Sequence, residues 1–302
     1  MCEYKLEKDI GEEHMKKQVN YDFTNFTNSQ SSLSKYLDLT EREIMMYIAL
    51  NRDECDPVEF LNHFNIDDEK LMDTELMISS LHVTTNNDEC CSIKRYGLTN
   101  LQQSVLLDTP LKRYLEDRGI SINISNKEIV FKGEIYNITK EYKGLERRSS
   151  SEWVSYKLYE DYQINSFFSC ANALEYGGNV SSRPEFLMNL ANFLKLGSIE
   201  KDWERDTDNK CYVVKFHVPL SDIAPRTFLG LNDIGYLEKY EIEVLKRKWI
   251  IKNSLSAINN ELFNGYKPEI FCEMNLDVSV PPDNIIKIYN PNEYLNEYVA
   301  DI

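Results

Sequence analysis

The stretch Glu269–Tyr289, EIFCEMNLDVSVPPDNIIKIY, decides how the second half of the chain is expected to fold. Apolar and polar residues alternate on both sides of the Pro281-Pro282 step, which is the pattern of one strand turning into another. Glu273 lies in the first of these two strands, eight residues before Pro281. A carboxylate at this place can point into a cleft beside a sheet, so Glu273 is a candidate catalytic residue.

The composition is that of a globular chain able to bury a core, with 302 residues and 42% hydrophobic side chains. Residues 1–17 are charged throughout and no apolar run approaches the length of a membrane span, so a cytoplasmic protein with no membrane partner is expected. The seven cysteines are odd in number and have no CxxC spacing, and the four histidines are scattered. These patterns predict neither a disulfide framework nor a metal site.

The first third of the chain predicts a flexible leader followed by a small helical domain. Residues 1–36 end in a polar segment rich in Asn, Ser and Thr. Residues 37–110 predict a winged helix-turn-helix-like domain. The expected helices begin at the capping box Thr40–Glu43, at Pro57 and at Asp67 or Asp68, the last running to Leu81. Two short strands around an Asn-Asn-Asp turn then form the expected wing, and a further helix is expected over residues 100–107.

The charge of this module argues against DNA binding. Residues 37–110 contain fifteen Asp or Glu residues and five Lys or Arg residues. A DNA-reading helix needs basic and amide side chains that reach phosphates and base edges. The acidic module therefore favours a protein partner or simple packing, although a salt-sensitive complex with duplex DNA would restore the DNA-binding interpretation.

Residues 111–302 predict a larger, mixed α+β domain whose 24 basic and 29 acidic residues are nearly balanced. The segment 236–263 fits a helix or a strand, and both interpretations stay open. The other expected elements are a short helix over 110–118, two strands within 120–138, a helix over 151–163, a strand near 165, a small helix over 173–176, a helix over 183–194, an acidic loop over 198–210, a strand over 211–223 and a peripheral acidic tail from 290.

Several familiar chemistries have no motif in this sequence. There is no G-x-G-x-x-G or phosphate-binding P-loop, no H-E-x-x-H and no G-x-S-x-G. Redox, kinase and hydrolase functions therefore lose support. What remains is an ordered set of short segments: Tyr142-Lys-Gly144, Phe168–Tyr176, Ser182-Arg183, Cys211–Pro219 and Glu273 with Val280-Pro-Pro-Asp283.

In this order the segments resemble the ADP-ribosyltransferase superfamily. Its members open the site with a Tyr-Arg-Gly or His-containing strand, continue with an aromatic-Ser strand leading to a helix, and finish with a Glu on a late strand. The last half of the chain is most similar to the DarT-type nucleic-acid ADP-ribosyltransferases, whose terminal strand has the same spacing from Glu to Val-Pro-Pro. Lys143 stands where many relatives have Arg, and the segment Phe167–Tyr176 lacks their Asn-Pro-Arg.

The resemblance implies glycosyl transfer from NAD, used as a substrate, to a nucleic acid or a protein, as in a toxin or defence effector. Glu273 would stabilise the oxocarbenium-like ribose through its 2′-hydroxyl. Tyr176 or Phe168 would stack on nicotinamide, and Ser169 would hold the aromatic wall or a ribose hydroxyl. The remaining cofactor-binding candidates are Tyr142, Lys143 and Arg183, the last two as partners of the pyrophosphate.

An alternative is a non-enzymatic regulatory protein. It would combine the acidic winged-helix-like module, which could bind a protein partner, with a domain that senses a nucleotide or another partner. Binding of NAD or ADP-ribose without turnover would favour this alternative over the transferase.

Overall fold

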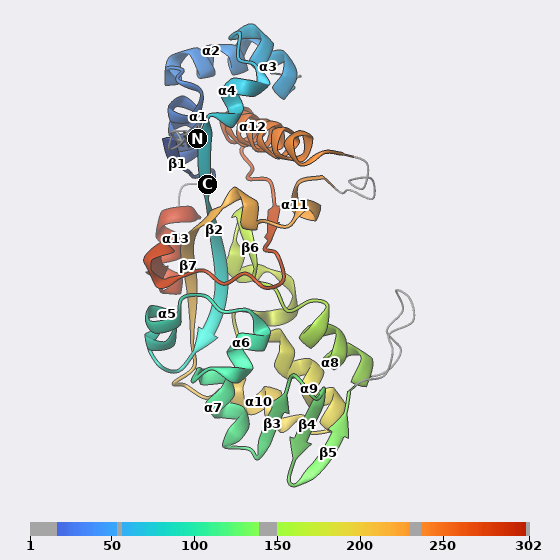
Figure 1. Cartoon of the computed structure of the whole chain (residues 1–302). Coiled ribbons are helices and arrows are strands. Elements are labelled where there is room, and N and C mark those ends of the chain that lie inside the picture. Colours follow the sequence, from blue (N-terminus) through green and yellow to red (C-terminus); the bar gives the residue numbers. More distant parts are fainter. Residues whose placement is uncertain (1–16, 53–55, 139–149, 230–236, 300–302) are drawn as a thin grey trace, which may run out of the picture.

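The computed structural model describes residues 17–52, 56–138, 150–229 and 237–299, and it has a mixed α+β fold (Figure 1). The helices are α1 (Phe26–Leu37), α2 (Glu41–Leu50), α3 (Pro57–His63), α4 (Asp68–Met72), α5 (Cys91–Tyr96), α6 (Leu101–Leu106), α7 (Pro110–Glu116), α8 (Ser150–Tyr159), α9 (Glu185–Leu194), α10 (Ser198–Arg205), α11 (Pro225–Leu229), α12 (Lys239–Phe263) and α13 (Pro291–Tyr298). The strands are β1 (Lys17–Tyr21), β2 (Thr74–Asn86), β3 (Ile120–Asn123), β4 (Glu128–Phe131), β5 (Glu134–Asn137), β6 (Asn165–Ser169), β7 (Lys210–Pro219), β8 (Ile270–Glu273) and β9 (Ile285–Tyr289).

The main sheet is built around β2, the long strand at the centre of Figure 1. Its order is β8-β6-β2-β7-β9, and β1 pairs with the first half of β2 in parallel while the other neighbours are antiparallel. In Figure 1, helices α1 to α4 and α12 lie beyond one end of the sheet, and α6 to α10 lie beyond the other. The small antiparallel sheet β3-β4-β5 belongs to this second group.

The stretch Glu269–Tyr289 forms two strands, as predicted, but the strands do not pair with each other. β8 pairs with β6 and β9 pairs with β7, so they lie at opposite edges of the main sheet. Between them, Val280 exchanges two backbone hydrogen bonds with Leu98, at N–O distances of 2.9 and 3.0 Å. Because proline has no N–H to donate, the pairing ends at the Pro281-Pro282 step.

The winged-helix prediction is wrong at its third helix and at its wing. The third helix begins at its predicted cap, Asp67, but ends at Met72, and residues 74–86 are the central strand β2. Thr74, Leu76 and Ile78 are buried, whereas Glu75 is exposed and Met77 is only partly buried, so the true period is two residues and not three to four. Residues 91–96, expected in the wing, form helix α5. A buried central strand cannot enter a DNA groove as a recognition helix would.

The prediction of a flexible leader is wrong for residues 17–36. They form β1 and most of α1, and Tyr21 and Leu33 are fully buried in the main core. The segment looked polar, yet its serines make internal hydrogen bonds. Ser32 Oγ, for example, accepts from the Asp22 N–H at 2.9 Å and bonds to the Asp22 carbonyl at 3.0 Å. Residues 1–16 lie outside the described residues.

Locally capped helices match their predictions closely. Thr40 and Glu43 form both bonds of the capping box at α2, and Pro57 starts α3. The helices α6, α7 and α9 lie within the segments predicted for them, and α8, β6 and β7 overlap theirs. The open segment 236–263 contains the single long helix α12.

Three other segments differ from their predictions. Residues 120–138 hold three strands rather than two. The acidic segment 198–210, expected as a loop, contains helix α10, because Ile199 and Trp203 bury one face of it. The tail forms helix α13 and is not peripheral, since Tyr294 and Tyr298 are buried.

The hydrophobic core has one main cluster and two smaller ones. The main cluster takes residues from Val19 to Leu98 and from Ile164 to Val280, so it includes both sides of the boundary predicted at residue 110. A second cluster, from Val105 to Trp203, fills the group of helices that includes α7 to α10. The predicted boundary is therefore not a division between hydrophobic cores.

Candidate functional site: a cavity beside the split between β2 and β6

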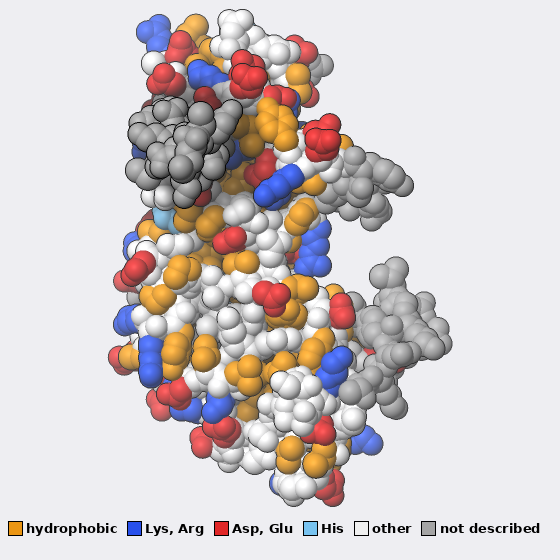
Figure 2. Space-filling model, viewed as in Figure 1, with side chains coloured by type: hydrophobic (Ala, Val, Ile, Leu, Met, Phe, Trp, Pro, Cys, Tyr) orange, Lys and Arg blue, Asp and Glu red, His pale blue; other side chains and the backbone are white. Residues whose placement is uncertain are grey.

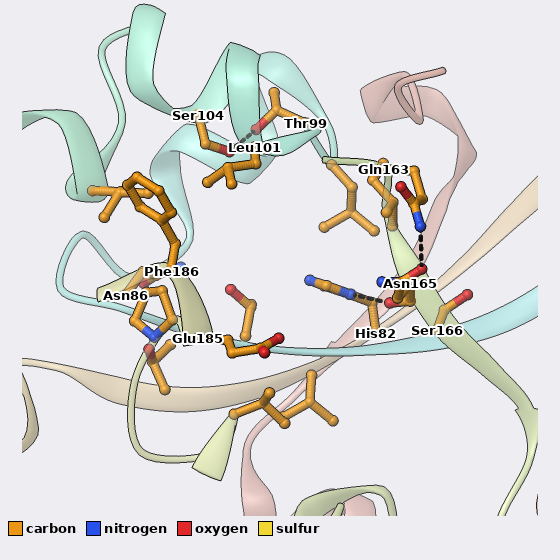
Figure 3. Close-up of a pocket in the computed structure, with 18 of the residues that line it drawn as sticks. His82, Asn86, Thr99, Leu101, Ser104, Gln163, Asn165, Ser166, Glu185 and Phe186 are labelled. Atoms are coloured by element: carbon orange, nitrogen blue, oxygen red, sulfur yellow. Dashed lines mark hydrogen bonds between the residues drawn. The ribbon is translucent and has the colours of Figure 1, made fainter. Parts of the chain in front are cut away.

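A cavity of ≈ 710 Å³ lies against the main sheet, where β2 and β6 separate (Figure 3). The two strands share a single register pair, Leu81 with Phe167. Beyond this pair, polar side chains of β2 face residues of α6 and α9 across the cavity. Figure 3 shows Ser104 and Leu101 on one side, Phe186 and Glu185 on another, and His82 and Asn165 opposite them. Its volume is in the range that holds a small organic ligand or cofactor.

His82 lies at the point where the strands separate. Its Nδ1 donates to the backbone carbonyl of Asn165 at 2.7 Å, a carbonyl at the start of β6. Since a carbonyl oxygen only accepts, Nδ1 carries a proton, and the neutral ring then offers Nε2 as a hydrogen-bond acceptor. Burial lowers the pKa of His82, and the bond to the Asn165 carbonyl only partly opposes this shift. Near neutral pH, His82 therefore offers the cavity an uncharged acceptor.

The lowered pKa of His82 predicts a loss of stability in acid. Below its ordinary pKa of 6.5 the unfolded chain takes up a proton that folded His82 resists, so the free energy of unfolding falls as the pH falls. The His82→Gln variant keeps a donor for Asn165 but cannot titrate. Chemical denaturation between about pH 7.5 and about pH 5.5 should show a smaller loss for this variant than for the wild type. His217, whose pKa is also lowered, is present in both proteins and cancels from the comparison. Equal losses in both proteins would contradict the assignment.

A chain of polar contacts continues along the wall from His82. Lys157 Nζ bonds to Asp161 at 2.7 Å and to Glu185 at 2.9 Å, which joins α8 to α9. Asp161 accepts from Gln163 Nε2 at 3.0 Å, and Gln163 Nε2 also reaches Asn165 Oδ1 at 3.3 Å. Burial opposes the charge of Lys157, but the two carboxylates outweigh it and raise the lysine pKa. The wall is thus preorganised, and its lysine is already neutralised by two acids.

Glu273 stands at the cavity on the edge strand β8. Its carboxylate forms an ion pair with Arg226 of α11. Its backbone is held on the outer side of the sheet, because its N–H donates to Thr227 Oγ at 3.0 Å and its carbonyl accepts from the Ala224 N–H at 2.8 Å. The backbone of β8 is therefore already hydrogen-bonded on its outer edge at Glu273. The Glu273 side chain is half-exposed and lines the cavity.

Three aromatic rings lie next to Glu273. Phe167, Tyr176 and Phe271 contact one another with ring centroids 5.0 to 5.2 Å apart, and Tyr176 and Phe271 are partly exposed. The turn that carries Tyr176 is held by the Tyr294 hydroxyl, which accepts from the Ala173 N–H at 3.0 Å. An exposed, fixed aromatic pair beside a carboxylate is a favourable surface for a flat cationic ring.

The structure brings three of the predicted site residues together and separates others. Glu273, Tyr176 and Arg183 line the same cavity. Arg183 is buried, however, with Nε paired to Glu200 and Glu204 and Nη1 donating to the Gly178 carbonyl at 2.8 Å. These partners give Arg183 a structural role in holding the turn around Gly178 to α10.

Of the remaining predicted residues, the two that the structure describes lie away from the cavity. Ser169 is buried on β6 and does not line the cavity. Phe168 is fully buried against Phe23, with centroids 4.9 Å apart, so it is not the stacking residue. Tyr142 and Lys143 lie outside the described residues.

Sequence reasoning missed His82, Gln163 and Asn165. The signal for His82 was present in the alternation of Leu81, His82 and Val83 within a β-branched run, but the helix and wing interpretation hid it. Gln163 and Asn165 carry no local motif. Their place at the cavity follows from the pairing of β6 with β8, 108 positions apart at Asn165 and Glu273.

In the part of the chain that the structure describes, no group of three or more His, Cys, Asp or Glu side chains is arranged to hold a metal ion. None of the helices in this part has the length and apolar character needed to cross a membrane.

Comparison with known proteins finds no match for this chain among family models, curated proteins or solved structures.

Proposed function

We propose that the chain is an NAD-dependent ADP-ribosyltransferase that modifies a nucleic acid or a protein. The observation that carries the proposal is the place of Glu273, whose carboxylate borders a cavity beside the exposed aromatic pair Tyr176 and Phe271. The chain order also supports it. The strand with Phe168-Ser169 and the late strand with Glu273 are neighbours in the sheet and follow one another along the chain in the order of that resemblance, while the expected opening segment, Tyr142–Gly144, lies outside the described residues.

In the proposed reaction, nicotinamide stacks on Tyr176 and Phe271 while its ribose lies at Glu273. The bond between nicotinamide and C1′ breaks, nicotinamide takes the electron pair, and C1′ becomes oxocarbenium-like. The Glu273 carboxylate accepts a hydrogen bond from the 2′-hydroxyl and stabilises the positive charge as it develops. A nucleophile of the target then bonds to C1′ and loses its proton. His82 offers its Nε2 to another hydroxyl or N–H of the same ligand.

The charges of the described walls favour the nicotinamide–ribose half of NAD. Lys157 and Arg183 each have two carboxylate partners, and Asp161, Glu185 and Glu273 make the walls acidic on balance. An acidic wall suits the cationic nicotinamide ring and uncharged hydroxyls, whereas a pyrophosphate prefers free cations. The proposal therefore assigns the nicotinamide and its ribose to this cavity and assigns no residue to the phosphates.

The macromolecular target is proposed only by class. Acidic and basic side chains are mixed on the face shown in Figure 2, where the described residues form no continuous basic area, and the whole chain carries a net charge of −16. Such a surface gives little non-specific attraction for nucleic acid, so a nucleic-acid target would be recognised locally.

The test is incubation of the full chain with NAD, followed by measurement of released nicotinamide and of labelled ADP-ribose on added nucleic acid and protein. Release or transfer supports the transferase. Binding of NAD in a thermal-shift experiment with neither product supports the alternative of a nucleotide-sensing protein. One observation favours that alternative specifically: Arg226 already neutralises the Glu273 carboxylate. Absence of binding, release and transfer would remove the proposal.

A further inference from the structure

Gln163 has a buried polar atom without a protein partner. The residue is 7% exposed, lines the cavity, and has an Oε1 that makes no hydrogen bond within the described structure. The orientation of its amide is fixed because Nε2 donates to Asp161, whose carboxylate can only accept. Figure 3 shows the nitrogen of Gln163 directed at Asn165 and its oxygen on the opposite side of the amide group. A buried acceptor of this kind costs free energy until a donor reaches it.

Gln163 and Glu273 lie on one face of the β6–β8 ladder. Asn165 is the register partner of Glu273, and the Met274 N–H donates to the Ile164 carbonyl at 3.0 Å, so the ladder continues toward Gln163. Gln163 is therefore the diagonal neighbour of Glu273, at a typical separation of about 7–8 Å between backbones. Two long side chains at this separation can converge on a single small group.

The aromatic surface lies on the other side of Glu273. Phe167 pairs with Phe271, two residues further along each strand, and these rings contact Tyr176. The order along the face is thus aromatic rings, carboxylate, then the free amide oxygen of Gln163. A nicotinamide on the rings would place its ribose between Glu273 and Gln163.

We propose that Glu273 and Gln163 together bind the two adjacent hydroxyls of the ribose, with Glu273 at the 2′-hydroxyl and Gln163 Oε1 at the 3′-hydroxyl. This inference rests on the proposed function, because it places the nicotinamide end of the ligand at the aromatic rings. The hydroxyl donates the hydrogen bond that Oε1 lacks. The acidic neighbours Asp161 and Glu185 exclude a phosphate from the same position and accept an uncharged hydroxyl. Gln163 is thereby a binding residue that selects ribosides over their 3′-deoxy analogues.

The experiment measures binding of benzamide riboside, whose C-glycosidic bond cannot be cleaved, and of its 2′-deoxy and 3′-deoxy analogues by titration calorimetry. The full-length wild type should bind the 3′-deoxy compound about threefold to tenfold more weakly than the riboside, the effect of one neutral hydrogen bond. Gln163→Met should weaken binding of the riboside and the 2′-deoxy compound by the same factor. It should leave binding of the 3′-deoxy compound unchanged, because the contact is already absent there.

Gln102→Met is the matched control. Gln102 is on α6, donates to the Leu158 carbonyl at 2.7 Å and does not line the cavity, so its loss should leave all three affinities as they are. An equal loss for all three compounds in Gln163→Met would assign the residue a structural role and overturn the inference. Equal binding of riboside and 3′-deoxy compound by the wild type would overturn it without any variant. If the wild type binds none of the compounds and releases no nicotinamide, the proposed function fails as well, whereas release of nicotinamide with an unaffected Gln163→Met removes this inference alone.

Discussion

Replacing Glu273 with Gln is expected to lower the rate of nicotinamide release from NAD by about 10²–10³-fold, the usual effect of removing one preorganised electrostatic group. Gln has the same shape and can still accept a hydrogen bond from a ribose hydroxyl. It lacks the negative charge that opposes the developing oxocarbenium charge. Because this charge develops only in the transition state, the affinity for NAD should change little while the turnover rate falls.

The stability of the Glu273→Gln variant should be close to that of the wild type. The ion pair with Arg226 is lost, but the two side chains are 36% and 51% exposed, and pairs this exposed contribute about 0–1 kcal/mol. The backbone of residue 273 keeps its bonds to Thr227 and Ala224. An unchanged melting temperature would therefore separate a catalytic loss from unfolding.

Two controls locate the effect in the carboxylate. Glu269→Gln makes the same chemical change just before β8, at an exposed residue that does not line the cavity, and it should leave nicotinamide release unchanged. Arg226→Gln removes the ion pair but keeps the Glu273 charge, so it should preserve turnover. Wild-type release in Glu273→Gln would end the assignment of this residue, and an equal loss in Arg226→Gln would assign the effect to the ion pair.

The parts of the fold that were predicted correctly depend on short-range signals. The Thr40–Glu43 capping box and Pro57 act within one helical turn, so their helices can be predicted without knowledge of the tertiary structure. The strands of Glu269–Tyr289 were equally clear, but their partners were not. Pairing of β8 with β6 and of β9 with β7 is a long-range property that alternation does not contain.

The central strand was missed because its apolar residues fit two periods. Leu76, Ile78 and Leu81 satisfy a loose helical stripe, and the buried serines in the middle of the strand weaken the alternation. Ser80 is buried because its hydroxyl bonds to Ser166 at 2.7 Å and to the Phe167 carbonyl at 2.9 Å. A serine that is satisfied by a partner 86 residues away cannot be recognised as a core residue from its neighbours in the chain.

The residues of the candidate site also differ in whether the local sequence or only a long-range contact reveals them. Glu273 and Tyr176 were predicted, because they stand in segments whose order resembles a known superfamily. Arg183 was predicted beside them and lines the same cavity, but its carboxylate partners on α10 come from a segment that was expected to be a loop. Gln163 could not be predicted from the sequence, because what distinguishes it is an amide oxygen that has no hydrogen-bond partner in the folded structure.

Replacing Gly97 with Ala is expected to give the largest loss of stability of any single methyl group added to the described glycines. A Cβ at Gly97 would lie 1.7 Å from the Val280 carbonyl oxygen and 2.9 Å from the Pro281 carbonyl carbon, both backbone atoms. The backbone of Gly97 also has φ +77° and ψ −160°, a region that is essentially restricted to glycine. The variant must therefore move the chain apart or change its backbone conformation.

Either movement breaks the bridge between Leu98 and Val280. We expect the free energy of unfolding to fall by roughly 2–6 kcal/mol, about 1–3 for backbone strain and about 1–3 for the two hydrogen bonds. Gly119→Ala is the matched control, because Gly119 has a similar φ of +69° and no atom within 4 Å of the added Cβ. Its cost should be only about 1–2 kcal/mol, that of the left-handed conformation. Chemical denaturation measures both variants, and equal losses would show that the contact with Val280 is not tight.

The same bridge connects stability to the site. Gly97 and Leu98 line the cavity. Val280, which pairs with Leu98, belongs to the segment that connects β8, the strand of Glu273, to β9 at the opposite edge of the sheet. If the Val-Pro-Pro step fixes this wall of the cavity, Gly97→Ala should weaken binding of benzamide riboside at temperatures where the variant is still folded, whereas Gly119→Ala should not. Unchanged binding by a folded Gly97→Ala variant would limit the role of the step to holding the fold together.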